Sequence, residues 1–491
     1  MWPPDVFAVV ASILRRSDAY SYAVERWPPR RDWVRFVKEL GARWRAAASV
    51  AASAPAEVGT WWRQVVASHG VPIDAVRQNT RLCEALLQLV AASDEACSGV
   101  GIPNPERELD AFETQASLQL LTHEPNTLCR LVHPSRAVVL PKLHTPRSGI
   151  TLRSLTHHLA LWESGEVCAQ WLWLPWRPSG PALNLLLLPW PSVILPRMFR
   201  PSPGRLQNMP EGFGFFTSDP REGHGRILAD ALRVVERAKA TVGDIDGIVF
   251  PELALRANEH LELCRRSGAF VIGGWGTPAP GNGRPGRNEV VIAVPIGKFV
   301  TTRAQSKHHR WRIDAGQIQQ YGLGGQLDPT VDWWENISVM PRRLTFWSIN
   351  PWLTIAVLIC EDLARQDPVA ELVRSIGPNL VITPLLDGPQ FVSRWAARYA
   401  TVLADDPGTS VLTLTSVGMA RLSRPPGKPE SRVVALWKDA RSRDTLEIGL
   451  KDGAVGVVLS LTREFAEEWT ADGRTDERTT AYILLNGVHQ V

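Results

Sequence analysis

An alternation of short apolar runs with amphipathic stretches, between residues 183 and 416, most constrains the fold of this chain. The apolar runs, such as LNLLLL, GIVF, AFVIGG, EVVIAV, WLTIAVLI, NLVITPL and SVLTLTS, are typical of strands buried on both faces. The stretches between them, such as GRILADALRVVERAKATV, NEHLELCRRSG and SRWAARYATVLA, have helical spacing. Strands that alternate with helices indicate a layered α/β domain whose sheet is covered on both faces.

The region before this domain has two other patterns. Up to about residue 125 the apolar positions recur at helical spacing, which predicts a helical N-terminal domain over 1–130. After Arg136 the runs AVVLPKL, HHLALWES and AQWLWLPW are separated by Pro and Gly. We interpret 131–180 as a short β-rich connecting region, with RPSGP at 177–181 as the candidate linker.

The α/β domain is expected to span 181–491. Its tail after Arg421 opens with the loop SRPPGKPE and continues with the strand-like runs RVVALWKD, GVVLSL and TAYILLN. We expect a short acidic helix among these strands.

The composition excludes several classes of protein. With 44% hydrophobic and 21% charged residues in 491, the chain is typical of globular proteins, and its net charge of +4 permits an anionic partner without requiring one. The six cysteines form no C-x-x-C pair, which favours a reducing, cytoplasmic setting and argues against a metal site. The N-terminus lacks the charge order of a secretory signal, and the apolar stretch 183–196 is too short and too rich in proline to span a membrane.

Three chemically useful side chains follow three predicted strands. Glu252 comes directly after GIVFP, Lys307 soon after GKFVTT, and Cys360 closes WLTIAVLIC. Functional groups of α/β sheets gather just beyond the carboxyl ends of strands. A carboxylate can take the thiol proton, the thiolate can attack carbon, and a fixed ammonium group can stabilise the oxyanion that develops. Taken singly, each residue is better explained as a buried thiol, a helix N-terminal acid or a solvated lysine. Taken together, they predict covalent hydrolysis.

The sequence contexts of these residues resemble those of the nitrilase, or carbon-nitrogen hydrolase, superfamily. DGIVFPELAL is similar to the family's glutamate strand, and WLTIAVLICEDLA to its cysteine elbow. GRNEVVIAVPIGKFVTTRAQSKHH is similar to its strand pair and lysine segment, with Asn288, Gly297 and Lys307 at the matching places. GPNLVITPL, SRWAARYA and TSVG continue the match in the family's order. The resemblance covers about three-fifths of the chain.

The resemblance implies an αββα sandwich preceded by the helical domain, and a Glu-Lys-Cys triad. Cys360 would be the nucleophile, Glu252 the general base and later acid, and Lys307 the oxyanion stabiliser, helped by the backbone N–H of Glu361. The reaction would be hydrolysis of a non-peptide C–N bond in a small molecule through a thioester. The acid after Cys360 favours an amide over a nitrile. The resemblance implies no cofactor, no metal and a homodimer.

The sequence departs from the family pattern after the lysine. Many members carry a second glutamate there, whereas RWRIDAGQIQQYGLGG contains none, and Asp314 is the nearest acid that could substitute. DPTVDWWENISVMPRR, at 328–343, is interpreted as an insertion over the pocket mouth. The side chains of Glu361 and Asp362 would raise the thiol pKa if they faced it, so we expect them to turn away and hold the elbow.

Other features have less specific interpretations. The basic run KHHRWR, from Lys307 to Arg312, could bind an anionic substrate, or only carry Lys307 into place. The Gly-rich stretch 276–288 lacks the ending of a phosphate loop and is expected at the rim of the active site. A second hypothesis is a nitrilase-like binding or regulatory protein, in a larger system that could involve nucleic acid or a protein partner. In either case we expect the helical region to restrict access or recruit a partner.

Overall fold

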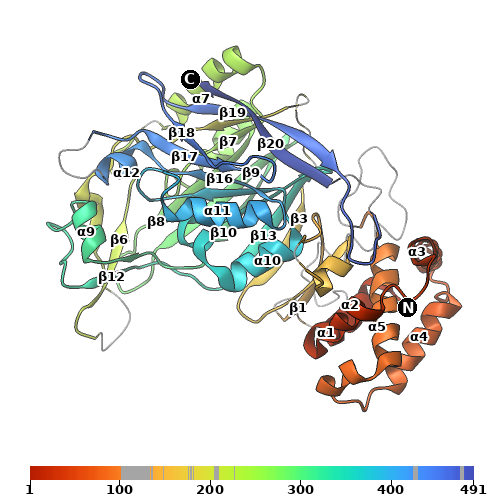
Figure 1. Ribbon diagram of the computed structural model, residues 1–491. Coiled ribbons are helices and arrows are strands. Elements are labelled where there is room, and N and C mark those ends of the chain that lie inside the picture. The colour runs from red at the N-terminus through yellow and green to blue at the C-terminus, as the bar shows by residue number, and fades with distance from the viewer. Residues whose placement is uncertain are drawn as a thin grey trace.

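The computed structural model describes residues 1–100, 133, 136–147, 149–174, 176, 178, 180, 182–203, 210–225, 227–423, 429–475 and 480–491. Two seven-stranded sheets form its centre (Figure 1). The first sheet, in spatial order, contains β10 (Phe299–Ser306), β9 (Arg287–Ile296), β8 (Phe270–Thr277), β7 (Gly247–Val249), β4 (Leu183–Leu187), β19 (Val457–Ala466) and β20 (Thr480–Gln490). The second contains β18 (Leu446–Gly449), β17 (Val433–Lys438), β16 (Ser410–Leu414), β15 (Leu380–Pro384), β14 (Leu353–Val357), β13 (Arg343–Asn350) and β3 (Cys168–Trp173).

The central strands of each sheet are parallel. In the first sheet β4, β7 and β8 run in one direction, and in the second β14, β15 and β16 do so. The carboxyl ends of these strands therefore lie at one edge of each sheet, where the loops that follow β7, β14 and β15 can meet.

The two sheets pack face to face. Successive side chains of a strand point to opposite faces, so each strand contributes to two different apolar layers. In β4, Leu185 and Leu187 lie in one buried apolar cluster with Ile355 and Leu412 of the second sheet. The intervening Leu186 lies in a different cluster, with residues of α7 (Ile227–Val242) and α8 (Glu259–Ser267). Full burial of each such side chain stabilises the fold by about 2 kcal/mol.

Helices cover both outer faces of this sandwich. α7 and α8 cover the first sheet, and α10 (Glu371–Ile376) and α11 (Trp395–Asp405) cover the second, in the centre of Figure 1. The order of layers is thus helix, sheet, sheet, helix, and the αββα sandwich expected from the sequence is confirmed.

A third, smaller sheet lies at one end of the sandwich, on the left of Figure 1. It contains β11 (Arg312–Ile313), β12 (Asp332–Glu335), β6 (Phe213–Ser218) and β5 (Phe199–Pro201), with α9 (Ala315–Gln320) beside it. Within 328–343, the stretch interpreted as an insertion over the pocket mouth, residues 332–335 form β12, which pairs with β6 and β11. β12 runs parallel to β6, with Asp332 opposite Phe213 and Glu335 opposite Phe216, two segments that are more than 100 residues apart in the sequence.

The first hundred residues are helical, as expected. They form α1 (Pro3–Ser17), α2 (Ala23–Arg26), α3 (Trp33–Ser49), α4 (Ala56–Ala67) and α5 (Thr80–Ala96), linked in part by 3₁₀ turns at Ala19–Tyr22 and Ile73–Gln78. α5 is buried along most of its length against α1, α3 and α4. The two-stranded sheet of β1 (Ala137–Pro141) and β2 (Leu159–Glu163) packs on the same apolar cluster.

Buried charges join the helical region to the rest of the chain. Arg474 is fully buried, and its guanidinium group pairs with Asp94 at 3.3 Å, Glu95 at 2.8 Å and Asp472 at 3.1 Å. Asp472 also accepts a hydrogen bond of 2.8 Å from the indole of Trp33. A buried charge is tolerated only when it is paired, so these contacts fix the helices against the C-terminal segment.

Other sequence expectations have mixed outcomes. β3 lies in the predicted connecting region but is an edge strand of the second sheet, paired with β13. The expected acidic helix in the tail is wrong, since β19 runs through Glu464 to Ala466 and pairs with β20 over that length. The helix expected over 101–125 and parts of the linker (Arg177, Ser179 and Pro181) lie outside the described residues. Among the helices that are described, none is long and apolar enough to cross a membrane.

Candidate active site

Cys360 stands at a sharp turn after β14. The chain leaves the strand at Val357 and begins a 3₁₀ turn at Cys360, whose φ of 46° lies in the left-handed region. That conformation is uncommon for a residue with a side chain and persists where the surroundings impose it, often at functional sites. Cys360 is 5% exposed. The thiol therefore projects from a constrained turn at the edge of the second sheet.

Glu252 reaches the site from the first sheet. β7 ends at Val249, and the next residues, Phe250 and Pro251, lead directly to Glu252, which is 1% exposed. The loop packs on β8 at Gly274, where an added Cβ would lie 2.5 Å from the Cα of Glu252 and 2.3 Å from the nitrogen of Leu253. Only glycine allows this close approach of backbones, so Gly274 determines where the Glu252 carboxylate can lie.

Both carboxylate oxygens of Glu252 accept hydrogen bonds. Oε1 accepts from Lys307 Nζ at 2.8 Å and from Asn288 Nδ2 at 2.7 Å, and Oε2 accepts from the backbone N–H of Leu386 at 2.7 Å. Leu386 follows β15 of the other sheet. Donors from both sheets therefore orient the carboxylate and stabilise its charge.

Lys307 is held between two carboxylates. It follows β10, its backbone N–H donates to the carbonyl of Asn288 at 2.8 Å, and its side chain is 1% exposed. Nζ lies 2.8 Å from Glu252 Oε1 and 2.8 Å from Glu335 Oε2. Glu335 ends β12 and also accepts from Asn288 Nδ2 at 2.7 Å and from the backbone N–H of Trp311 at 3.1 Å. Two buried glutamates thus hold the ammonium group, and Asn288 links their carboxylates.

Asp314 does not join this cluster. Its side chain is exposed and accepts the backbone N–H of Gln317 at 3.0 Å, as the N-terminal cap of α9. Glu335, which the sequence did not single out, is the second acid beside Lys307, and the expectation that Asp314 takes this place is wrong. The available signal was the short aromatic run DWWE, because adjacent tryptophans favour a strand and Glu335 comes directly after them.

The charges of the site affect one another. Burial raises the pKa of the Cys360 thiol well above its usual range, and the charge of Glu252 raises it further, while Lys307 lowers it. Burial likewise raises the pKa of Glu252 against the opposing effect of Lys307. Burial alone would lower the pKa of Lys307, but Glu252 and Glu335 outweigh it and raise that pKa. The resting site therefore holds a neutral thiol beside a charged lysine, with a carboxylate that can accept the thiol proton.

The two acids after Cys360 turn into structural contacts, as expected. The carboxylate of Glu361 pairs with Arg365 at 2.6 Å. The fully buried carboxylate of Asp362 accepts the backbone N–H of His308, at 3.1 and 3.0 Å to its two oxygens, and contacts His309 Nδ1 at 2.9 Å. Asp362 thus ties the turn that carries Cys360 to the segment that carries Lys307.

The basic run after Lys307 is mostly engaged within the protein. Arg310 donates to the carbonyl of Glu335 at 2.7 Å, and Arg312 pairs with Asp332 at 2.6 Å. These contacts favour its role as the segment that carries Lys307 into place. The Gly-rich loop before β9 lies beside the segment that follows β12, where the backbone N–H of Gly286 donates to the carbonyl of Asn336 at 2.9 Å.

A further acid lies near the thiol. Asp387 follows Leu386, and its charge raises the pKa of Cys360. Its Oδ1 accepts from Tyr321 at 2.8 Å and from Arg394 at 2.6 Å, and its Oδ2 from the indole of Trp395 at 3.0 Å. This paired acid was not anticipated from the sequence.

A metal ion is not needed to explain these carboxylates. In the site, the ammonium group of Lys307 occupies the place between Glu252 and Glu335 that a cation would take. Elsewhere in the described residues, Asp94, Glu95 and His158 lie close enough to share an ion. Both acids, however, pair with Arg474, and Asp94 also accepts the backbone N–H groups of residues 157–159.

No family model matches the sequence, and no curated protein matches it. Solved structures that match include Nit3 of Saccharomyces cerevisiae, a member of branch 10 of the nitrilase superfamily, at 15% identity and a TM-score of 0.34. That match covers 55% of this chain and 86% of Nit3. An amidase from Nesterenkonia sp. matches at 13% identity and a TM-score of 0.33, over 58% of this chain and 91% of the amidase. The glutamine-dependent NAD+ synthetase of Acinetobacter baumannii matches at 13% identity and a TM-score of 0.31, over 63% of this chain and 47% of the synthetase. Because these identities and TM-scores are low, the function is inferred from the residues of the site.

Proposed function

We propose that this chain is a cysteine hydrolase of the nitrilase type that cleaves a non-peptide C–N bond, with an amide as substrate. The observation that carries the proposal is the bridge of Lys307 Nζ between Glu252 and Glu335, at 2.8 Å to each, beside a cysteine at a left-handed turn. Burying three charges together is costly, and buried charges beside a potential nucleophile are a frequent feature of active sites.

In the proposed first half-reaction, Glu252 takes the proton of Cys360 as the sulfur attacks the carbonyl carbon of the amide. The electron pair of the C=O bond moves to oxygen, and this oxyanion is stabilised by the ammonium group of Lys307 and the backbone N–H of Glu361. Glu252 then gives the proton to the leaving nitrogen as the C–N bond breaks. Ammonia or an amine departs, and the acyl group remains on sulfur as a thioester.

In the second half-reaction, Glu252 takes a proton from water, and the resulting hydroxide attacks the thioester carbon. The C–S bond breaks, the proton returns to sulfur, and a carboxylic acid leaves. Glu335 and Asn288 act as positioning residues, because they contact Lys307 and Glu252 rather than the reacting atoms. No step requires a cofactor.

The contacts of the helical N-terminal region do not favour a role in controlling access to the active site. Its hydrogen bonds and ion pairs to the remainder of the described chain run to residues 157–163, Glu371 and 472–474. None of these residues lies in the site. Recruitment of a partner therefore suits this region better than a lid over Cys360.

Ammonia release from a panel of primary amides, carbamoyl compounds and nitriles tests the proposal. At least one amide should be turned over by the wild-type protein and not by Cys360→Ala. Brief incubation with that amide, followed by acid quench and mass spectrometry, should show the acyl mass on the peptide that contains Cys360. Turnover by Cys360→Ala at the wild-type rate, or no turnover of any compound, would favour the alternative of a binding or regulatory protein.

A further inference from the structure

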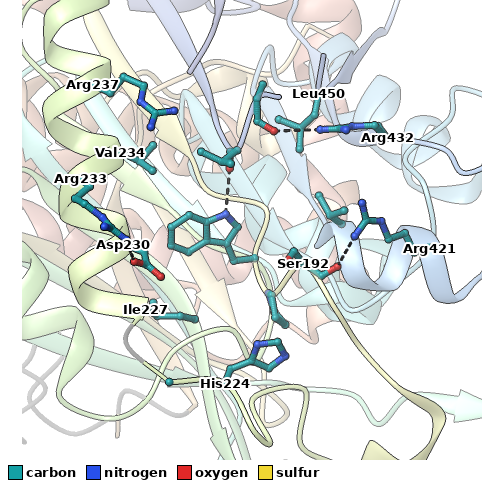
Figure 2. A pocket seen from close by; sticks show the side chains of 16 residues that line it. Ser192, His224, Ile227, Asp230, Arg233, Val234, Arg237, Arg421, Arg432 and Leu450 are labelled. Atoms are coloured by element: carbon teal, nitrogen blue, oxygen red, sulfur yellow. Dashed lines mark hydrogen bonds and ion pairs between the residues drawn. The ribbon is translucent and has the colours of Figure 1, made fainter. Parts of the chain in front are cut away.

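A cavity lined by arginines lies apart from the active site. It has a volume of about 560 Å³ and lies between α7, α12 (Val417–Leu422) and the loops that follow β4 and β18. Figure 2 shows Arg233 and Arg237 projecting from α7 on one side, and Arg421 and Arg432 on the other. Glu252, Lys307, Glu335 and Cys360 do not line it.

The charge of this cavity is unbalanced. Its lining contains four guanidinium groups and one carboxylate, that of Asp230, which pairs with Arg233 on the surface of α7. In the part of the chain that the structure describes, the guanidinium group of Arg237 has no hydrogen bond or ion pair. Like charges repel, so a cluster of this kind is maintained at a cost unless an anion occupies it.

The arginines on the opposite wall are fixed in place. Arg421 donates to the carbonyl of Ser192 at 3.2 Å, and Arg432 donates to the carbonyl of Ala454 at 3.1 Å. Their acidic contacts, Glu430 for Arg421 and Asp452 for Arg432, are exposed and weak. A guanidinium group bound through one N–H to a backbone carbonyl keeps its other donors for a ligand.

Much of the remaining wall is apolar, although Ser192 and His224 also line the cavity. Figure 2 shows Val234 and Ile227 on the α7 side of the cavity and Leu450 beside Arg432. Trp190 also lines the cavity, and its ring is fixed by a hydrogen bond of 3.1 Å from its indole N–H to the carbonyl of Val455. The cavity can therefore take an organic group as well as an anionic one, and its volume is in the range usual for small-molecule sites.

We propose that this cavity binds a small organic phosphate, such as a nucleotide, with its phosphoryl oxygens between the two pairs of arginines. Planar guanidinium groups match the oxygen pairs of phosphate, and four of them from three segments can surround a di- or triphosphate. The organic part would contact Trp190, Val234 and Leu450. This site goes beyond the proposed hydrolase activity and does not depend on it.

Calorimetric titration of the full chain with pyrophosphate and with ATP, at low salt, tests this proposal. Arg237→Glu reverses an unpaired charge and places a carboxylate one helical turn from Arg233, so it should weaken binding of both probes by about tenfold or more. Arg303→Glu makes the same change in net charge on the exposed face of β10, outside the cavity, and should leave binding unchanged. Arg421→Gln repeats the test from the opposite wall.

Saturable binding of both probes that Arg237→Glu and Arg421→Gln weaken, and Arg303→Glu does not, would establish the site. Absence of binding by the wild-type protein, or equal loss in all three variants, would overturn it. A single-stranded oligonucleotide that binds more tightly than ATP would also overturn it, in favour of a polymer. Circular dichroism of each variant verifies folding, and ammonia release by the variants shows separately whether the active site is intact.

Discussion

Glu335 Oε2 lies 2.8 Å from Lys307 Nζ, although β12 and β10 belong to different sheets. The contact joins the small sheet at the end of the sandwich to the strand end that carries the lysine. Glu252 and Glu335 thus hold one ammonium group from two sides, and Asn288 links the same two carboxylates. The small sheet is therefore part of the candidate active site rather than an appendage to it.

Glu335→Gln tests this relationship. The amide keeps the shape of the side chain but removes one of the two charges that fix Lys307, so we expect kcat/KM to fall by about 10- to 100-fold. Asp314→Asn is the matched control, because Asn also caps a helix and Asp314 is exposed at the start of α9. A loss for Asp314→Asn that equals the loss for Glu335→Gln would show that Glu335 has no special role.

The pH dependence of kcat/KM should report the charge of Glu252. Glu252 must be ionised to take the thiol proton, and burial raises its pKa above the usual 4.5. We therefore expect activity to fall on the acid side at a pH above 4.5. The negative charge of Glu335 contributes to the raised pKa, so Glu335→Gln should move this limb to lower pH. A limb that stays in place would contradict the assigned coupling.

Reaction with an electrophilic thiol probe should distinguish Cys360 from buried structural thiols. Burial raises the pKa of Cys264 to about 12, against the opposing charge of Arg265. Cys360 should label faster because Glu252 can take its proton, and Glu252→Gln should slow labelling of Cys360 without changing that of Cys264. Peptide mapping by mass spectrometry measures both. Equal rates for the two cysteines in the wild-type protein would remove the support for an activated thiol.

Gly274→Ala should damage the site through the backbone. The new Cβ would lie 2.3 Å from the nitrogen of Leu253, so the Glu252 loop or β8 must shift. We expect a loss of about 1–3 kcal/mol in the free energy of unfolding, together with a large loss of activity. Gly324→Ala, where the added Cβ meets no atom within 4 Å, is the control. Urea unfolding and ammonia release are measured on both variants, and only Gly274→Ala should lose stability and activity.

Arg474→Met should destabilise the docking of the helical region. It leaves the carboxylates of Asp94, Glu95 and Asp472 buried without their shared partner, which should cost about 3–5 kcal/mol. Limited proteolysis should then cleave within residues 1–100 earlier than in the wild-type protein. Arg303→Met, at an exposed position, should change stability by less than about 0.5 kcal/mol. Equal stability of the two variants would show that the buried ion pairs do not hold the helices in place.

The sequence determined the layered part of the fold to a large extent. Continuous apolar runs such as those of β4, β14 and β15 can only be buried on both faces, so they predicted the sandwich and the strand ends that carry Glu252 and Cys360. The helical spacing of the first hundred residues was equally informative. Short or weakly patterned strands, such as β6, β12 and β13, were not recognised, because their pairing partners are distant in sequence.

The contacts of the site were decided by the tertiary structure alone. Asp314 is 7 residues from Lys307 and lies outside the cluster, whereas Glu335 is 28 residues away and contacts Nζ. Sequence distance fails here because β12 pairs with β6, and that pairing, rather than the chain between them, carries Glu335 to the lysine. The same holds for Arg474 and for the arginine-lined cavity, where residues from remote segments meet. A sequence names the groups that can react or bind, but their distances, burial and mutual charge effects arise only when the segments pack together.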